Sequence, residues 1–258
     1  SQVPVGTCGL IRSLIRKSNQ TLDFDIAYSP ENLRLGRAIE CFQNPDRIVI
    51  GADNNSTLDR VEALFSAIDV PKLRMSLKTA EMTKHALNAF LATSISFANE
   101  IANLCDEVGA DALKVATALR MDGRIGQKAF LEPGLGFAGG TLARDLRALQ
   151  NLGTMSVCET PLINGVLRVN EQQNRVVIKK LEKIYGSIKD LMVGVLGLTY
   201  KPDTSTLRRS AALEIIESLT NKGAKVKAYD PKASVEEVQQ HKEFKFCADP
   251  YEVSWASD

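Results

Sequence analysis

The 258-residue chain is poor in the residues that build metal centres and disulfide frameworks. It has two histidines, His85 and His241, and no clustered Cys/His pattern, which argues against a zinc site. An odd number of cysteines cannot all pair within one chain, and none of them shows CxxC spacing. We therefore expect reduced thiols and a cytoplasmic location. The cysteines are Cys8, Cys41, Cys105, Cys158 and Cys247.

Long apolar runs and an excess of one charge are also missing. The most apolar long segment, 86–104, is interrupted by Asn88, Asn99, Glu100 and Asn103, which argues against a membrane span. A net charge of +1, without a long block of one sign, argues against nucleic acid or an anionic membrane as the main partner. No signal-peptide pattern opens the chain.

The residues that are present indicate a globular α/β protein. With 44% hydrophobic residues, the chain can bury cores for about two domains, or three small ones. Residues 1–75 hold strand-like runs at 25–28 and 47–51 and a helix-like run at 56–68. We interpret this region as the end of a parallel-sheet domain whose opening strands are absent.

Region 76–176 is almost entirely helical in pattern. Apolar residues at three- and four-residue steps predict one continuous stripe on a long helix, and a second helix is expected at 112–119. The stripe consists of Leu87, Phe90, Leu91, Ile95, Ala98 and Ala102.

Region 177–258 contains a strand at 192–198, a helix at 210–221 stopped by Gly223, and a strand at 225–231. A strand, a helix and a strand in this order predict a βαβ unit and a second parallel sheet.

The stretch PGLGFAGGTLARDL begins at Pro133 and carries the spacing Gly134-x-Gly136-x-x-Gly139 of a dinucleotide-binding turn. That turn requires a preceding strand, but the segment before it is polar and broken by glycines, so we reject this interpretation. A helix capped by Thr141 is expected to follow and to stop at Gly153. The loop is either an anion-binding or oxyanion-binding backbone surface or an ordinary connector between helices.

Four segments together resemble the nucleotide-sugar 6-dehydrogenases, the UDP-glucose and GDP-mannose dehydrogenase family. They are YSPENLRLGRAIECFQNPDRIVIG from Tyr28, AEMTKHALNAFLATSISFANEIANLCDEVGAD from Ala80, GRIGQKAFLEPGLGFAGG from Gly123, and VGVLGLTYKPDTSTLRRSAALEIIESLTNKGAKVKAYDP from Val193. The resemblance implies an NAD-binding Rossmann domain, a helical middle domain that forms a homodimer, and a Rossmann-like domain that holds the nucleotide. It also implies that most of the first domain is missing from this chain and that the chain stops inside the last one.

The resemblance further implies two hydride transfers from C6 of the sugar to NAD, through a thiohemiacetal and a thioester on a cysteine. Lys84 and Asn88 resemble the residues that stabilise the oxyanion, although Lys84 is alternatively a solvated charge and Asn88 a polar break in the helix. Asp145 matches the residue that helps to place the water. Glu31 matches the first of two glutamates in the family's P-E-F-L-x-E segment, of which the second is a candidate for proton transfer. The remaining matches are Arg124, Phe130, Leu131, Phe137, Gly139, Tyr200 and Lys201 for the substrate, and Arg144 and Arg208 for the cofactor.

Three positions depart from the family pattern. Thr141 falls on the catalytic cysteine, Leu35 on a second glutamate, and Gln2 on a threonine. A threonine hydroxyl is a much weaker nucleophile than a thiolate, so the thioester route is closed. Two functions follow: oxidation at C6 toward an aldehyde or uronic acid without a covalent intermediate, or a catalytically silent homologue that binds nucleotide sugars and dimerises.

Overall fold

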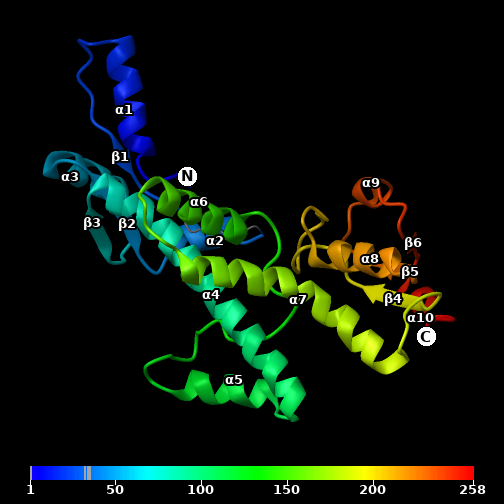
Figure 1. Ribbon diagram of the computed structural model, residues 1–258. Coiled ribbons are helices and arrows are strands. Elements are labelled where there is room, and N and C mark those ends of the chain that lie inside the picture. Colours follow the sequence, from blue (N-terminus) through cyan, green and yellow to red (C-terminus); the bar gives the residue numbers. More distant parts are fainter. Residues whose placement is uncertain (1, 32, 34–35) are drawn as a thin grey trace. The chain divides into compact units, whose positions relative to one another are not determined.

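The computed structural model describes residues 2–31, 33 and 36–258. The chain divides into two compact units, which we describe separately (Figure 1). The first unit comprises Ser1–Asn88 and Asn151–Val157, and the second comprises Ala89–Gln150 and Cys158–Asp258.

The first unit is built on a three-stranded sheet with the order β1-β2-β3. Strand β2 pairs in parallel with β3, a strand that the sequence analysis did not identify, whereas β1 pairs with β2 antiparallel. The expected parallel pairing is therefore present between β2 and β3 but not at β1, because apolar periodicity identifies a strand but does not give its direction. The elements are α1 (Thr7–Ser18), β1 (Ala27–Tyr28), α2 (Ala38–Gln43), β2 (Ile48–Ala52), α3 (Asn55–Leu64) and β3 (Lys72–Met75).

Strand β2 is buried along its whole length. Val49 packs on one face with Leu77 and Ala80, whereas Ile48 and Ile50 pack on the other face. Burial on both faces explains why this strand reads as a continuous apolar run rather than an alternating one.

Helix α4 (Leu77–Val108) is continuous and passes from the first unit into the second after Asn88. Helix α5 (Ala112–Met121) follows, with Asp111 accepting hydrogen bonds from the first-turn N–H groups. Helix α6 begins at Thr141, as the sequence predicts, but it continues past Gly153 to Met155, so Gly153 as its stop is wrong. A glycine disfavours a helix interior by only about 1 kcal/mol, which neighbouring contacts outweigh.

Helix α7 (Pro161–Tyr185) runs through residue 176, where the sequence predicts a domain boundary. In the second unit it contributes to a core with α4 and α6, formed by Ala89, Ala92, Leu146 and Val166. Two alanines on α4 allow the neighbouring helices to approach closely. This packing places the start of α6 and the middle of α7 around the glycine-rich loop.

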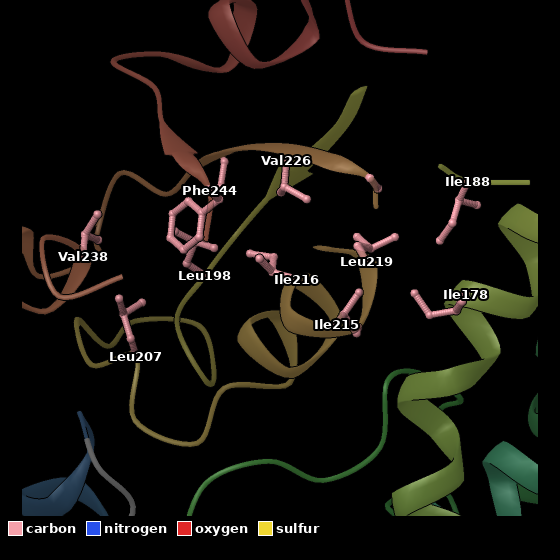
Figure 2. Packing of buried hydrophobic residues seen from close by; sticks show 12 residues of the cluster. Ile178, Ile188, Leu198, Leu207, Ile215, Ile216, Leu219, Val226, Val238 and Phe244 are labelled. Atoms are coloured by element: carbon pink, nitrogen blue, oxygen red, sulfur yellow. The ribbon is translucent and has the colours of Figure 1, made fainter. Parts of the chain in front are cut away.

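The C-terminal part of the second unit contains three parallel strands in the order β4-β5-β6, which confirms the predicted second parallel sheet. Ser210 caps α8 by accepting from Ala212 N–H, so the predicted helix and its start are confirmed. Figure 2 shows Ile216 and Leu219 among the buried side chains gathered around α8. The elements are β4 (Met192–Leu196), α8 (Ala211–Asn221), β5 (Lys225–Tyr229), α9 (Val235–Val238), β6 (Lys245–Phe246) and α10 (Pro250–Ser254).

Within the described part of the chain, no helix is both long enough and apolar enough to cross a membrane.

Candidate functional site

The N-terminal part of α4 carries a row of buried polar side chains in the first unit. Glu81, Lys84, His85 and Asn88 lie at helical spacing on one face, and each is less than a tenth exposed. Buried polar and charged groups lower stability unless they have partners. This face of α4 therefore requires polar partners inside the protein or on a ligand.

Lys84 is 9% exposed, and its Nζ donates a hydrogen bond of 2.7 Å to the carbonyl oxygen of Glu31. The interpretation of Lys84 as a solvated charge is therefore wrong. A buried ammonium acts in a less polar medium than water, where it stabilises a developing negative charge more strongly. The Glu31 side chain is exposed and accepts from Leu33 N–H at 2.6 Å.

Asn88 is also buried, one turn beyond Lys84 on the same helix face. Gln2 is half-buried. Leu35, the third departure from the family pattern, lies outside the described residues.

Sequence reasoning missed Glu81 and His85. The carboxylate of Glu81 accepts from Gly6 N–H at 2.6 Å and from Cys8 N–H at 2.8 Å, and so caps the N-terminus of α1. His85 Nε2 lies 2.8 Å from the carbonyl oxygen of Val3. Only the helical spacing of these residues with Lys84 and Asn88 could have indicated them.

Burial, together with the hydrogen bond and charge of Glu81, raises the pKa of the Cys8 thiol to about 11. The thiolate is the nucleophilic form of cysteine. Cys8 is therefore a buried, protonated thiol at neutral pH and not a nucleophile.

In the second unit, the segment between α5 and α6 contains no strand. The rejection of the dinucleotide fingerprint is thus confirmed. Gly136 has a φ of +88°, and a Cβ there would lie 2.5 Å from Asn170 Oδ1. The glycine is required by close packing on α7 rather than by a pyrophosphate.

The residues assigned to the sugar differ in exposure. The Arg124 side chain is 90% exposed and forms an ion pair with Asp122 at 2.7 Å. Phe130 is exposed, but Leu131 is buried and Phe137 packs against the core of α4, α6 and α7. The latter two can therefore present mainly their backbone to a ligand.

Thr141 is exposed at the first position of α6, and Asp145 is buried one turn later. Arg144 is exposed on the same first turn. The first turn of a helix carries N–H groups that favour negative charge. This position suits a hydroxyl or carboxylate of a substrate, and the Thr141 side chain is accessible there.

The loop after β4 packs on the end of the glycine-rich loop. A Cβ at Gly139 would lie 3.0 Å from the ring of Tyr200, and Gly139 N–H donates to the carbonyl oxygen of Arg209 at 3.0 Å. Lys201 Nζ lies 5.7 Å from the centre of the Tyr200 ring. Arg208 is exposed on the same loop.

Asp230, which the sequence analysis did not select, follows β5 at the carboxyl edge of the second sheet. Its carboxylate accepts from the N–H groups of Leu198, Thr199 and Lys232 at 2.7 to 2.9 Å. Burial acts to raise its pKa, but these hydrogen bonds outweigh burial and the pKa is lowered. Asp230 therefore holds the loop that carries Tyr200.

Among the described residues, no group of three His, Cys, Asp or Glu side chains is arranged to hold a metal ion.

Models of three domains of one family match the chain in order. The NAD binding domain of the UDP-glucose/GDP-mannose dehydrogenase family matches residues 1–69, its central domain 78–172, and its UDP binding domain 194–258. The segments that carry the resemblance in the sequence fall largely within these ranges.

Individual relatives agree with the family models. The chain is 43% identical to the UDP-glucose 6-dehydrogenase TuaD of Bacillus subtilis (strain 168), covering 90% of this chain and 50% of that protein. It is 38% identical to a UDP-glucose 6-dehydrogenase of Rhizobium meliloti (strain 1021), covering 100% and 60%. A solved UDP-glucose dehydrogenase from the hyperthermophilic archaeon Pyrobaculum islandicum has a TM-score of 0.94 and 36% identity, over 100% of this chain and 60% of that one. The chain thus spans about half the length of the curated relatives it matches.

Proposed function

Because the chain belongs to the UDP-glucose/GDP-mannose dehydrogenase family, we propose that the protein oxidises C6 of a nucleotide sugar of the UDP-glucose type with NAD. The observation that carries this proposal is the burial of Lys84 and Asn88 on one face of α4. A solvated lysine at this position would stabilise a developing negative charge only weakly, because water screens its charge. A buried ammonium beside an amide suits the stabilisation of an oxyanion on the substrate.

The absence of a thiol at position 141 limits the products that we propose. The hydroxyl of Thr141 cannot replace a thiolate as nucleophile at neutral pH without a strong base beside it. Oxidation therefore stops at the aldehyde, or continues on the aldehyde hydrate to the uronic acid without a covalent intermediate. Asp145, at the start of α6, is the residue that we assign to the positioning of water.

NAD, when bound, supplies a hydride acceptor for the sugar. We assign its phosphates to Arg144 and Arg208, whose side chains are exposed and can form bidentate bonds. The start of α1 does not fit this role, because Glu81 already accepts from the N–H groups of Gly6 and Cys8. A second carboxylate or phosphate at that helix start would meet the negative charge of Glu81.

We assign the nucleotide of the substrate to Tyr200 and Lys201. The sugar is assigned to the exposed Phe130, to Gly139 and to the backbone of Leu131 and Phe137. Arg124, held by Asp122 and otherwise exposed, is assigned to the substrate of a partner subunit.

NADH formation with UDP-glucose and GDP-mannose tests the proposal. Lys84→Met is expected to lower kcat by about 100- to 1000-fold, the effect of removing one oxyanion donor. Lys78→Met, an exposed lysine on the same helix, is the matched control and should leave kcat unchanged. Equal activity of the Lys84 variant and the unmodified protein would contradict the assignment. Thr141→Cys, in turn, is expected to increase the yield of uronic acid.

The departures at Gln2, Leu35 and Thr141 favour a second candidate, a silent homologue that binds nucleotide sugars. Calorimetry that detects UDP-glucose binding by a protein without NADH formation would support this candidate. Measurable turnover would exclude it.

We also propose a homodimer formed through the helical middle region, and a cytoplasmic location consistent with five free cysteines. Phe90 on α4 is 70% exposed and Met121 on α5 is 73% exposed. Large exposed apolar side chains of this kind mark interaction surfaces. Phe90→Asp is expected to give a monomer in light scattering, whereas Leu64→Asp, at an exposed site of α3, should leave the mass unchanged.

A further inference from the structure

Side-chain amides on two helices hold the backbone of the glycine-rich loop in the second unit. Asn99 Oδ1 accepts from Gly134 N–H at 2.7 Å, and Gln173 Nε2 donates to the Gly134 carbonyl oxygen at 2.7 Å. Asn103 Nδ2 donates to Gln173 Oε1 at 3.1 Å and so orients that amide. We call Asn99, Asn103, Asn170 and Gln173 the amide clamp.

Asn170 makes the most specific contact of the clamp. Its Oδ1 accepts from Phe137 N–H at 2.7 Å, and its Nδ2 donates to the Phe137 carbonyl oxygen at 3.0 Å. A single side chain thus satisfies both backbone groups of one residue, as a neighbouring strand would. The contact leaves little room beside Gly136, where a Cβ would lie 2.5 Å from Asn170 Oδ1 and φ is +88°.

Pairing of buried side chains does not by itself explain the amide clamp. Asn99 is 1% exposed and needs a partner inside the protein, but Asn170 and Asn103 are only half-buried and could bond to water. Three of the amides nevertheless bond directly to the backbone of one short loop without secondary structure, and the fourth, Asn103, orients Gln173. Backbone groups in a loop of this kind would otherwise be left to solvent.

We infer that Asn170 and Gln173 are positioning residues of the proposed reaction. They fix the backbone of Gly134 and Phe137 and thereby set where α6 begins, with Thr141 on its first turn and Asp145 one turn later. The far end of the loop is held separately, by the bond from Gly139 to Arg209. For its catalytic part the inference rests on the proposed function.

Asn170→Asp tests the inference with little change in size. It keeps an oxygen that accepts from Phe137 N–H but replaces the donor to the Phe137 carbonyl by a second acceptor. Asn170→Leu removes both bonds. Asn164→Asp is the matched control, because Asn164 is exposed on the same helix and bonds to Gln150 instead of the loop.

Amide hydrogen exchange is the readout that does not depend on catalysis. Removal of one hydrogen bond is expected to accelerate exchange at Phe137 N–H by about 5- to 10-fold in the Leu variant. Exchange within α8 should stay unchanged. Unchanged exchange at Phe137 in a folded variant would overturn the inference. If the Leu variant does not fold, exchange at Phe137 N–H in Asn170→Ala, which also removes both bonds, decides in the same way.

Steady-state kinetics tests the catalytic part. A loop displaced by about 1 Å can lower a rate by about 100-fold, so we expect Asn170→Asp to lower kcat by about 10- to 100-fold and to change the KM for UDP-glucose by less than about 3-fold. An equal loss in the Asn164 control, or a change confined to KM, would overturn the positioning role. Absence of NADH formation by the unmodified protein would contradict only the proposed function, and the exchange result would still decide whether the clamp holds the loop.

Discussion

Replacement of Glu81 by glutamine is expected to destabilise the protein and to make Cys8 more reactive. Glu81 is fully buried, and its two oxygens accept from Gly6 and Cys8 N–H. The glutamine amide keeps one acceptor but places an NH₂ group opposite a backbone donor. The start of α1 therefore loses one of its two bonds and retains an unpaired N–H, and the bond that remains is no longer charge-assisted.

The magnitude follows from these two bonds. A hydrogen bond to a charged group contributes about 1.5–3 kcal/mol, and a buried unpaired donor costs about 1–3 kcal/mol. Allowing for relaxation, we expect Glu81→Gln to lower the free energy of unfolding by about 2–4 kcal/mol. Glu100→Gln, an exposed site on the same helix, should change it by less than about 0.5 kcal/mol.

Two assays on the same samples check this prediction. Urea denaturation gives the free energy of unfolding, and native-state alkylation followed by mass spectrometry gives the reactivity of Cys8. Because Glu81 contributes to a Cys8 pKa of about 11, its neutralisation should lower that pKa and speed alkylation at pH 8. Unfolding free energies that match those of the Glu100 control, with unchanged Cys8 alkylation, would refute the reasoning.

Three further predictions concern the second unit. Asp230→Asn should lower the free energy of unfolding at pH 7 by about 1–3 kcal/mol. Because the folded-state pKa of Asp230 is lowered, this contribution is present above the unfolded pKa near 4 and is lost as the pH falls below it. Thermal melts of the two proteins should therefore converge in acid. Gly136→Ala should destabilise by about 1–3 kcal/mol in urea titration, through its positive φ and the contact with Asn170, and a neutral effect would contradict that geometry. Cys158, which is exposed, should react with a thiol reagent before Cys247, whose pKa burial raises; the reverse order would contradict the burial pattern.

Local signals in the sequence predicted much of the fold. Ser210 and Gly223 bound α8 because a side-chain cap and a left-handed glycine act over one helical turn. Short strands such as β3 escaped prediction, since its half-exposed, charged sequence has no apolar run. The antiparallel direction of β1 relative to β2 could not be predicted either, because the pairing of strands is not a local property of the sequence.

Of the candidate site, the sequence by itself determined the residue types: Lys84 and Asn88 at helical spacing, a glycine-rich loop, and Thr141 where a cysteine is expected. Only the tertiary structure decided that Lys84 is buried, that Glu81 caps the N-terminus of α1, and that Asn170 bonds to the backbone of Phe137. The bonds of Glu81 and Asn170 join residues 73 and 33 positions apart. Periodicity cannot reveal such bonds, because their partners meet only after the helices have packed.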